Sequence, residues 1–157
     1  MRLTKISIVA MALGVMAVSS NSYAAAKETH ISHNDLPAAV QKAADELTTG
    51  ATKVIYTKDD ENGKIEYEVT VVTKGHKKDI AFDPNGTLIE IEETVAFDAL
   101  PDAVKAGLKE QAKERKIGVV ESITKKGAIV AYEAHLSGGG NKEIQVGPDG
   151  KLLDHEE

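Results

Sequence analysis

The side chains with the clearest chemical potential follow an alternating pattern at two places in the chain. Glu66, Glu68 and Thr70 alternate with apolar residues, and Glu133 and His135 do the same further along. Such alternation is typical of a strand with one buried and one solvated face. Two carboxyl groups could act as acid and base only if desolvation shifted one pKa, which a solvated face does not do. We therefore predict a partner-binding surface made of these five residues. A charged, solvated face without a ligand is the simpler alternative.

Two other groups contain residue types that bind metal ions. His30 and His33 lie three residues apart beside Glu28 and Asp35, a spacing that a helix would bring together, but this segment precedes the first predicted helix. Residues 59–63 (DDENG) resemble a calcium loop, which needs glycine at its sixth position and Glu at its twelfth. Here glycine is fifth and the twelfth residue is not Glu, so a polar turn between two strands is expected at 59–63 instead. We predict neither a metal site nor a bound cofactor.

The serines and glycines do not form a catalytic or nucleotide-binding motif. Beyond residue 24 the serines are Ser32, Ser122 and Ser137, and none lies in a Gly-x-Ser-x-Gly turn. The three glycines at 138–140 lack the Lys-Ser/Thr ending of a phosphate-binding loop, so we expect a hairpin turn there. We predict that the protein is not an enzyme.

Composition narrows the class of protein further. The 157 residues include 25 acidic and 19 basic side chains, giving a net charge of −6, and there is no cysteine or tryptophan. The missing cysteines exclude disulfides and thiolate-bound metals. The negative charge argues against a nucleic-acid partner, because such surfaces are basic.

The N-terminus has the pattern of a secretory signal peptide. Arg2 and Lys5 precede an apolar run at 6–18, and small residues follow, with cleavage expected after Ala24 or Ala26. The apolar run is shorter than the ~20 residues that span a bilayer, although an uncleaved membrane anchor is the alternative. We predict a periplasmic protein with no stable membrane insertion after cleavage.

The rest of the chain contains an internal duplication. LPAAV at 36–40 recurs as LPDAV at 100–104, and DIAFDPNG at 79–86 recurs as EIQVGPDG at 143–150. Matches in the same order at the same offset indicate tandem repeats. The predicted organisation is a signal peptide at 1–24, a flexible N-terminal segment at 25–34, and repeats at 35–95 and 98–153.

Within each repeat the hydrophobic period changes from helical to extended. Leu36, Val40, Ala43 and Leu47 are spaced as one face of a helix, and alternating strands with Pro/Asn/Asp/Gly turns follow. The second repeat has the same arrangement. The predicted fold class is therefore α+β, with two tandem units that each consist of a helix and an antiparallel meander.

Two details of this prediction concern the ends and the core of the helices. The positive charges of Lys113, Arg115 and Lys116 suit a helix C-terminus, so the second helix is expected to continue to Gly118. Phe82 and Leu47 are candidate core residues, and truncating either one to alanine would cost about 2–5 kcal/mol if it is buried.

The repeated pattern resembles a known family. Leu-Pro-x-Ala-Val at a helix start, then Tyr67-Glu68-Val69, then a strand closing on Asp-Pro-Asn-Gly is similar to PepSY-like modules of secreted bacterial proteins, in their beta-lactamase-inhibitor-like, tandem form. The resemblance covers residues 35–153. It implies helices packed on one face of an antiparallel sheet, an open concave second face, and proteins that bind or inhibit other proteins, notably peptidases, without catalysis.

Two functional hypotheses follow. The first is a non-catalytic periplasmic binding module that recognises a partner protein, such as a peptidase or another enzyme, through the open sheet face. The alternative is an accessory protein of the cell envelope that binds a small ligand or a metal cation, which the acidic charge and scattered histidines would favour.

Overall fold

A computed structural model describes residues 27–61, 63–138 and 143–153. These residues form two helices and one antiparallel sheet whose eight strands lie in chain order. The predicted signal peptide and its cleavage sites, and the glycines at 139 and 140, lie outside the described residues. The helices are α1 (Ala38–Leu47) and α2 (Asp102–Ala112), and the strands are β1 (Lys27–Ile31), β2 (Lys53–Glu61), β3 (Lys64–Thr73), β4 (His76–Phe82), β5 (Leu88–Val95), β6 (Ile117–Lys125), β7 (Ala128–Leu136) and β8 (Glu143–Val146).

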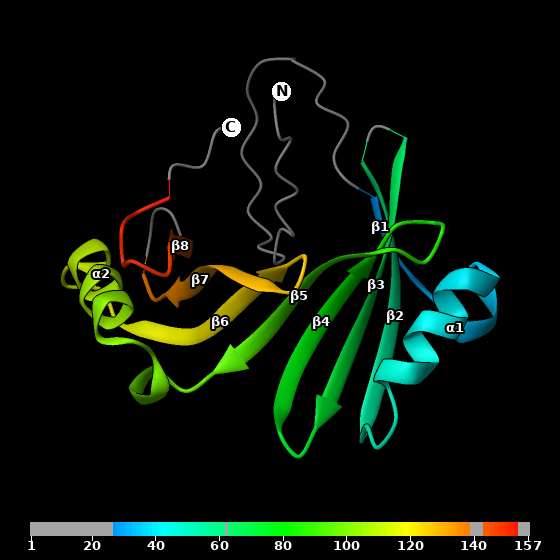
Figure 1. The fold of residues 1–157 in the computed structure, drawn as a ribbon, viewed down its shortest axis with the longest axis horizontal. Helices are drawn as coiled ribbons and strands as arrows, with labels where there is room; N and C mark the ends of the chain where they lie inside the picture. Colours follow the sequence, from blue (N-terminus) through cyan, green and yellow to red (C-terminus); the bar gives the residue numbers. More distant parts are fainter. Residues whose placement is uncertain (1–26, 62, 139–142, 154–157) are drawn as a thin grey trace.

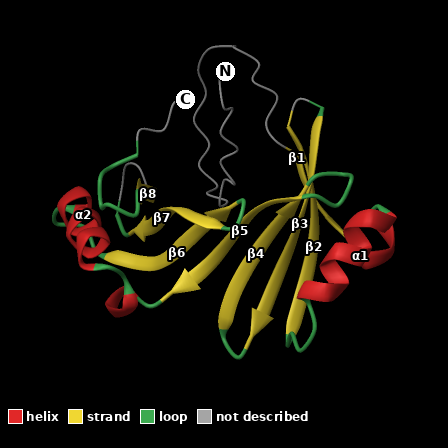
Figure 2. Cartoon of the chain, viewed as in Figure 1, coloured by secondary structure: helices red, strands yellow, loops and turns green. Residues whose placement is uncertain are grey.

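The sheet is continuous across the two repeats, because β5 of the first repeat pairs antiparallel with β6 of the second. Figure 1 shows the strands curving between α1 at one end and α2 at the other. Figure 2 shows the same arrangement coloured by element type. Each helix covers its own apolar cluster, one built around Val69 and Phe82 and the other around Val120 and Val146.

Both helices cover the same face of the sheet. On β5, Ile91 packs against the α1 cluster and Val95 packs against the α2 cluster. Residues four apart on a strand point to the same side, so the two clusters lie on one face. The prediction of an α+β fold with both helices on one sheet face is confirmed. We call the other face, which no described helix covers, the open face.

A repeated turn contact shows how closely the two halves correspond. Gly86 and Gly150 both adopt a positive φ, of +79° and +80°. A Cβ added to Gly86 would lie 2.6 Å from the carbonyl oxygen of Ala39, and one added to Gly150 would lie 2.1 Å from that of Ala103. Only glycine fits both the backbone conformation and this close approach. Each Pro-Asn/Asp-Gly turn therefore packs directly against the first turn of the helix in its own repeat.

Two predictions about the N-terminal part of the chain are wrong. The segment expected to be flexible at 25–34 contains β1, which pairs with β2, followed by a short 3₁₀ turn at His33–Asp35. The polar turn expected at 59–63 is shorter, because β2 extends to Glu61. Pairing with β1 on one side and β3 on the other supplies backbone hydrogen bonds to these polar residues, which the local pattern does not reveal.

The helix predictions also need correction. α2 ends at Ala112 instead of Gly118, because Lys113 takes a positive φ of 54° at the C-cap. Leu47 is 46% exposed and is not a core residue, since Ala44 occupies the buried position of that turn. Phe82 is 1% exposed, which confirms its place in the core.

Candidate functional site

All five predicted site residues lie on the open face, but in two groups. Glu66, Glu68 and Thr70 belong to β3, and Glu133 and His135 belong to β7. They alternate with buried residues that face the helices, as the period of two requires. Three strands, β4 to β6, separate the two groups. The structure therefore places the predicted residues on one surface without bringing them into one cluster.

The space between the two groups is also acidic, which the sequence analysis did not recognise. Asp79 on β4, Glu90 and Glu92 on β5, and Glu121 on β6 all point to the open face, since Asp79 pairs with Glu92 and Ala81 pairs with Glu90. The apolar residues of these strands predict the strands themselves but say nothing of the acidic side chains between them. The alternation of Glu90 and Glu92 with Ile91 was the signal that could have revealed them.

Two of these carboxyl groups have strongly perturbed pKa values. Burial, followed by the charge of Asp79, raises the pKa of Glu68 to about 7. Burial, then a hydrogen bond and the charge of Glu90, raise the pKa of Glu92 to about 9. Desolvation disfavours the charged form of a carboxyl group. The expectation that this face is solvated and leaves its carboxyl groups unperturbed is therefore wrong for Glu68.

A few lysines partly compensate the negative charge. Lys64 Nζ lies 2.8 Å from Glu66 Oε1, and Lys77 pairs with Asp79. Glu68 accepts a hydrogen bond from Thr70 Oγ1 at 3.2 Å. Carboxylates exceed the cations that contact them on this face within the described residues, so the surface has a negative potential that a cationic ligand would neutralise.

His135 has acidic neighbours on both sides of its ring. Its Nε2 atom lies 3.2 Å from Glu121 Oε2 and 3.7 Å from Glu133 Oε1. Its Nδ1 atom lies 3.4 Å from Glu143 Oε1 on β8. Gln145 Nε2 donates a hydrogen bond of 2.6 Å to Glu133 Oε2. His135 is therefore not a freely solvated side chain, because three carboxylates contact it.

The first half of the sheet carries a corresponding set of positions with different side chains. Thr70 corresponds to His135, since each sits two residues after the Glu of the Tyr-Glu pair and opposite an acidic residue on the next strand. Thr70 Oγ1 lies within hydrogen-bond distance of two carboxyl oxygens, Asp79 Oδ1 at 2.7 Å and Glu68 Oε1 at 3.2 Å. The matching pairs are Thr57 and Glu121, Glu68 and Glu133, Thr70 and His135, Asp79 and Glu143, and Ala81 and Gln145.

The two N-terminal histidines do not form a shared site. His30 Nδ1 lies 3.5 Å from the Thr57 hydroxyl, whereas His33 Nε2 contacts Asp45 of α1 at 2.8 Å. The strand that carries His30 ends before the turn that carries His33, so the helical spacing on which a metal site would depend is absent.

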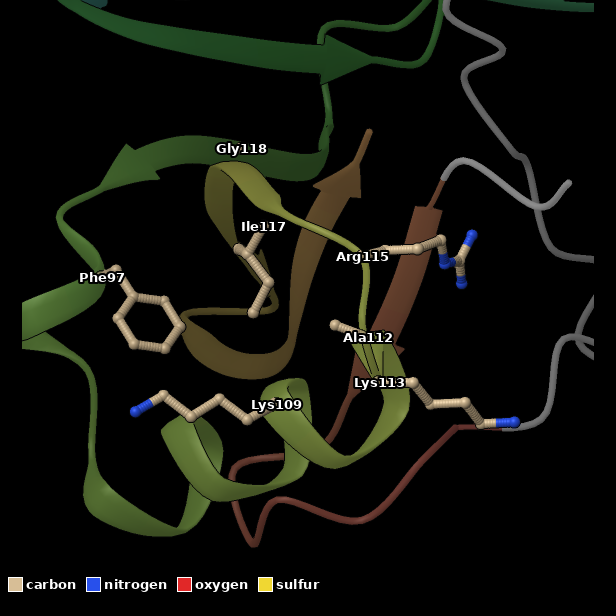
Figure 3. Close-up of a pocket in the computed structure, with 7 residues that line it drawn as sticks. All are labelled: Phe97, Lys109, Ala112, Lys113, Arg115, Ile117 and Gly118. Atoms are coloured by element: carbon tan, nitrogen blue, oxygen red, sulfur yellow. The ribbon is translucent and has the colours of Figure 1, made fainter. Parts of the chain in front are cut away.

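A separate pocket of about 280 Å³ lies beside the C-terminal end of α2. Its lining includes Phe97, Lys109 and Ile117 (Figure 3). Lys109 Nζ lies 5.5 Å from the centre of the Phe97 ring, a cation–π distance. Figure 3 shows Arg115 and Lys113 extending away from Phe97. The seven lining residues include no carboxyl group and no hydroxyl group.

The duplicated architecture agrees with a comparison against protein families. The family described as "Putative beta-lactamase-inhibitor-like, PepSY-like" matches residues 22–90 and again residues 66–154. The chain belongs to the PepSY-like family. The two matched regions support the tandem repeat in this PepSY-like protein, although the precise repeat boundaries stay a prediction.

Solved structures with the same fold come from Bacteroides. A DUF2874 family protein from Bacteroides ovatus is 17% identical, with a TM-score of 0.62 over 76% of this chain and 85% of that one. A protein from Bacteroides eggerthii described as "putative periplasmic" is 16% identical, with a TM-score of 0.61 over 76% and 86% of the two chains. A BLIP-like protein from Bacteroides fragilis is 20% identical, with a TM-score of 0.54 over 75% and 83%.

These structures establish the fold of the PepSY-like chain. No curated protein matches it. The helices in the described part of the chain are too short and too polar to span a membrane.

Proposed function

We propose that this PepSY-like protein is a non-catalytic binding protein of the periplasm whose open face holds a basic segment of a partner protein. The observation that carries the proposal is the row of carboxyl groups across the open face, in which Glu68 and Glu92 have pKa values raised to about 7 and about 9. Perturbed groups of this kind cluster at functional sites. The description of the family as beta-lactamase-inhibitor-like favours an exported enzyme as the partner.

A lysine or arginine side chain of the partner would offset the repulsion among the carboxyl groups of this surface. Glu92 lies between Asp79 on β4 and the acidic residues of β6 and β7. Its raised pKa keeps it protonated when no partner is bound. A cation from the partner would favour the ionised form and lower its pKa. Because the site is partly desolvated, the attraction would be stronger than that of an exposed ion pair.

A non-catalytic role is supported by what the three candidate serines do. Ser32 Oγ donates a hydrogen bond to Asp35 at 2.7 Å, away from the acidic row. Ser122 is buried on the opposite face of the sheet and donates to the carbonyl oxygen of Glu93. Ser137 follows the last residue of β7. No hydrogen bond joins any of the three to His135 among the contacts of the described residues, whereas a serine nucleophile needs such a contact with its base.

The proposal is tested with the mature chain, from residue 25, and a fluorescent lysine-rich peptide as the probe. Anisotropy should show binding that weakens as salt is raised, because screening acts on exposed parts of the interface. The double variant Glu68→Gln/Glu92→Gln should bind about tenfold more weakly, equivalent to about 1.4 kcal/mol. The matched control Asp102→Asn/Glu110→Gln neutralises two exposed acids of α2 and should bind as the native chain does.

Partner capture from a periplasmic extract extends the same comparison. A protein retained by the native chain and the α2 control, but lost by the open-face variant, would support the proposal. Equal binding by all three chains, or binding that is insensitive to salt, would show that the acidic face is not the interface.

A further inference from the structure

We propose that the second half of the open face binds one divalent transition-metal ion, with Glu121, Glu133 and His135 as its ligands. One ligand atom from each of these residues lies within 4.8 Å of the others. The site goes beyond the proposed partner binding and does not depend on it. The three residues come from the paired strands β6 and β7, so the sheet backbone fixes their relative positions.

The distances match a compact metal site. Zinc–ligand bonds of 2.0–2.1 Å in a tetrahedral site place neighbouring ligand atoms roughly 3.3–3.5 Å apart. His135 Nε2 lies 3.2 Å from Glu121 Oε2 and 3.7 Å from Glu133 Oε1. An ion could therefore be held after small side-chain movements, with its fourth position open to water or to a ligand.

Two residues of β8, Glu143 and Gln145, orient the side chains of His135 and Glu133. Glu143 Oε1 lies 3.4 Å from Nδ1 of His135, the nitrogen that would not bind the ion. A carboxylate at that position selects the tautomer whose Nε2 lone pair is available to a metal. Gln145 Nε2 donates 2.6 Å to Glu133 Oε2 and leaves the other oxygen of Glu133 directed to His135. Glu143 and Gln145 are thus positioning residues.

The donor set favours a transition metal over calcium. One imidazole nitrogen and two carboxylate oxygens suit zinc and its neighbours, whereas calcium takes six to eight oxygen ligands. Glu121 is 5% exposed and directly opposite Glu133 on the next strand. Like charges directly opposite each other destabilise a sheet, and a divalent ion between them would remove the repulsion.

The first half of the sheet provides an internal control. Thr57 and Thr70 occupy the positions of Glu121 and His135, and the Thr70 hydroxyl instead bonds to Glu68 and Asp79. Threonine hydroxyls in place of a carboxylate and an imidazole are poor ligands for zinc. We therefore infer one ion per chain and not two.

The experiment is a calorimetric titration of zinc into the metal-free mature chain, without an affinity tag. We expect one ion per chain with micromolar affinity or better, and the cobalt-substituted protein should show the absorption of a nitrogen- and oxygen-ligated ion. His135→Thr and Glu121→Thr, which copy the first repeat, should abolish binding. Glu143→Gln should weaken it by about 10–100-fold. His30→Gln, which changes a histidine on β1, should leave binding unchanged.

Circular dichroism and thermal unfolding of the metal-free variants separate loss of the site from loss of the fold. Folded His135→Thr that no longer binds zinc would support the site. The proposal is overturned if the native chain shows no heat and no thermal stabilisation at about 1 mM zinc, or if His135→Thr retains the affinity. It is also overturned if calcium binds more tightly than zinc, or if NMR shows that His135 stays protonated when zinc is added.

Discussion

Where the first half of the sheet carries Thr57 and Thr70, the second half carries Glu121 and His135, whereas the acidic residues Glu68 and Asp79 have acidic counterparts in Glu133 and Glu143. Thr70 Oγ1 bonds to Asp79 Oδ1 at 2.7 Å, whereas His135 contacts three carboxylates. The helix-facing side of both halves is apolar and has a similar arrangement. The comparison shows that the buried face preserves the duplicated framework while the open face can acquire different chemistry in each copy.

The helix-facing side also contains a difference, at the contact between helix and turn. Position 43 is alanine in α1, and the corresponding position 107 is glycine in α2. A Cβ added at Gly107 would lie 1.9 Å from the carbonyl oxygen of Gly150. The second turn therefore approaches its helix more closely than an alanine at that position would allow.

The largest expected effect concerns the core beneath α1. Phe82→Ala should lower the free energy of unfolding by about 3–5 kcal/mol, because a fully buried ring leaves a cavity. Leu47→Ala, on the same cluster's helix but 46% exposed, should cost less than about 1 kcal/mol. Chemical denaturation measures both. Similar losses for the two variants would mean that the end of α1 is packed more tightly than the structure shows.

The next effect tests the difference between the two helix–turn contacts. Gly107→Ala should destabilise the protein by about 3 kcal/mol, because the new methyl group overlaps the Gly150 carbonyl and forces the turn outward. Ala43→Gly, the reciprocal change in α1, should cost about 1 kcal/mol through backbone entropy. Thermal unfolding of both variants is the measurement. A neutral Gly107→Ala would contradict the close approach seen in the second half.

Much of the fold follows from local patterns. The helical spacing around Val40 and Val104, the alternation around Tyr67 and Tyr132, and the repeated Pro-Asn/Asp-Gly turns predict the elements and their order. The end of α2 could not be predicted in this way, because lysine is not a residue type that favours the positive φ that Lys113 adopts. The strand β1 was missed because its pairing with β2 is not encoded in five local residues.

The candidate site was only partly predictable, for a related reason. The period of two correctly assigns Glu68 and His135 to the open face. Their neighbours come from other strands, and the register that places Asp79 beside Glu92 and Glu121 beside Glu133 is not visible in a single segment. The raised pKa values depend on those cross-strand neighbours and on burial, so they emerge only from the structure.

The third expected effect is a dependence of stability on pH. The pKa of Glu92 is raised to about 9 by burial, by Glu90 on its own strand and by Glu133 and Glu121 on β7 and β6, and Asp79 faces it from β4. The native state therefore keeps a proton on Glu92 that the unfolded state releases near pH 4.5. Protonated Glu92 makes its full contribution to stability below that pH, and the contribution is lost as the pH rises towards 9. Glu92→Gln should therefore gain stability relative to the native chain as the pH rises from 4.5 towards 9, by up to about 1.4 kcal/mol per pH unit. Chemical denaturation at several pH values measures this difference.

The central claim is that the open face holds desolvated carboxyl groups ready for a cation. The most direct measurement is a pH titration of the side-chain carboxyl carbons of Glu92 and Glu68 by NMR, in the mature chain without metal or partner. We predict that Glu92 stays protonated well above pH 7 and that Glu68 titrates near 7. Midpoints near 4.5 for both groups, the ordinary value, would show a solvated face and would contradict the account.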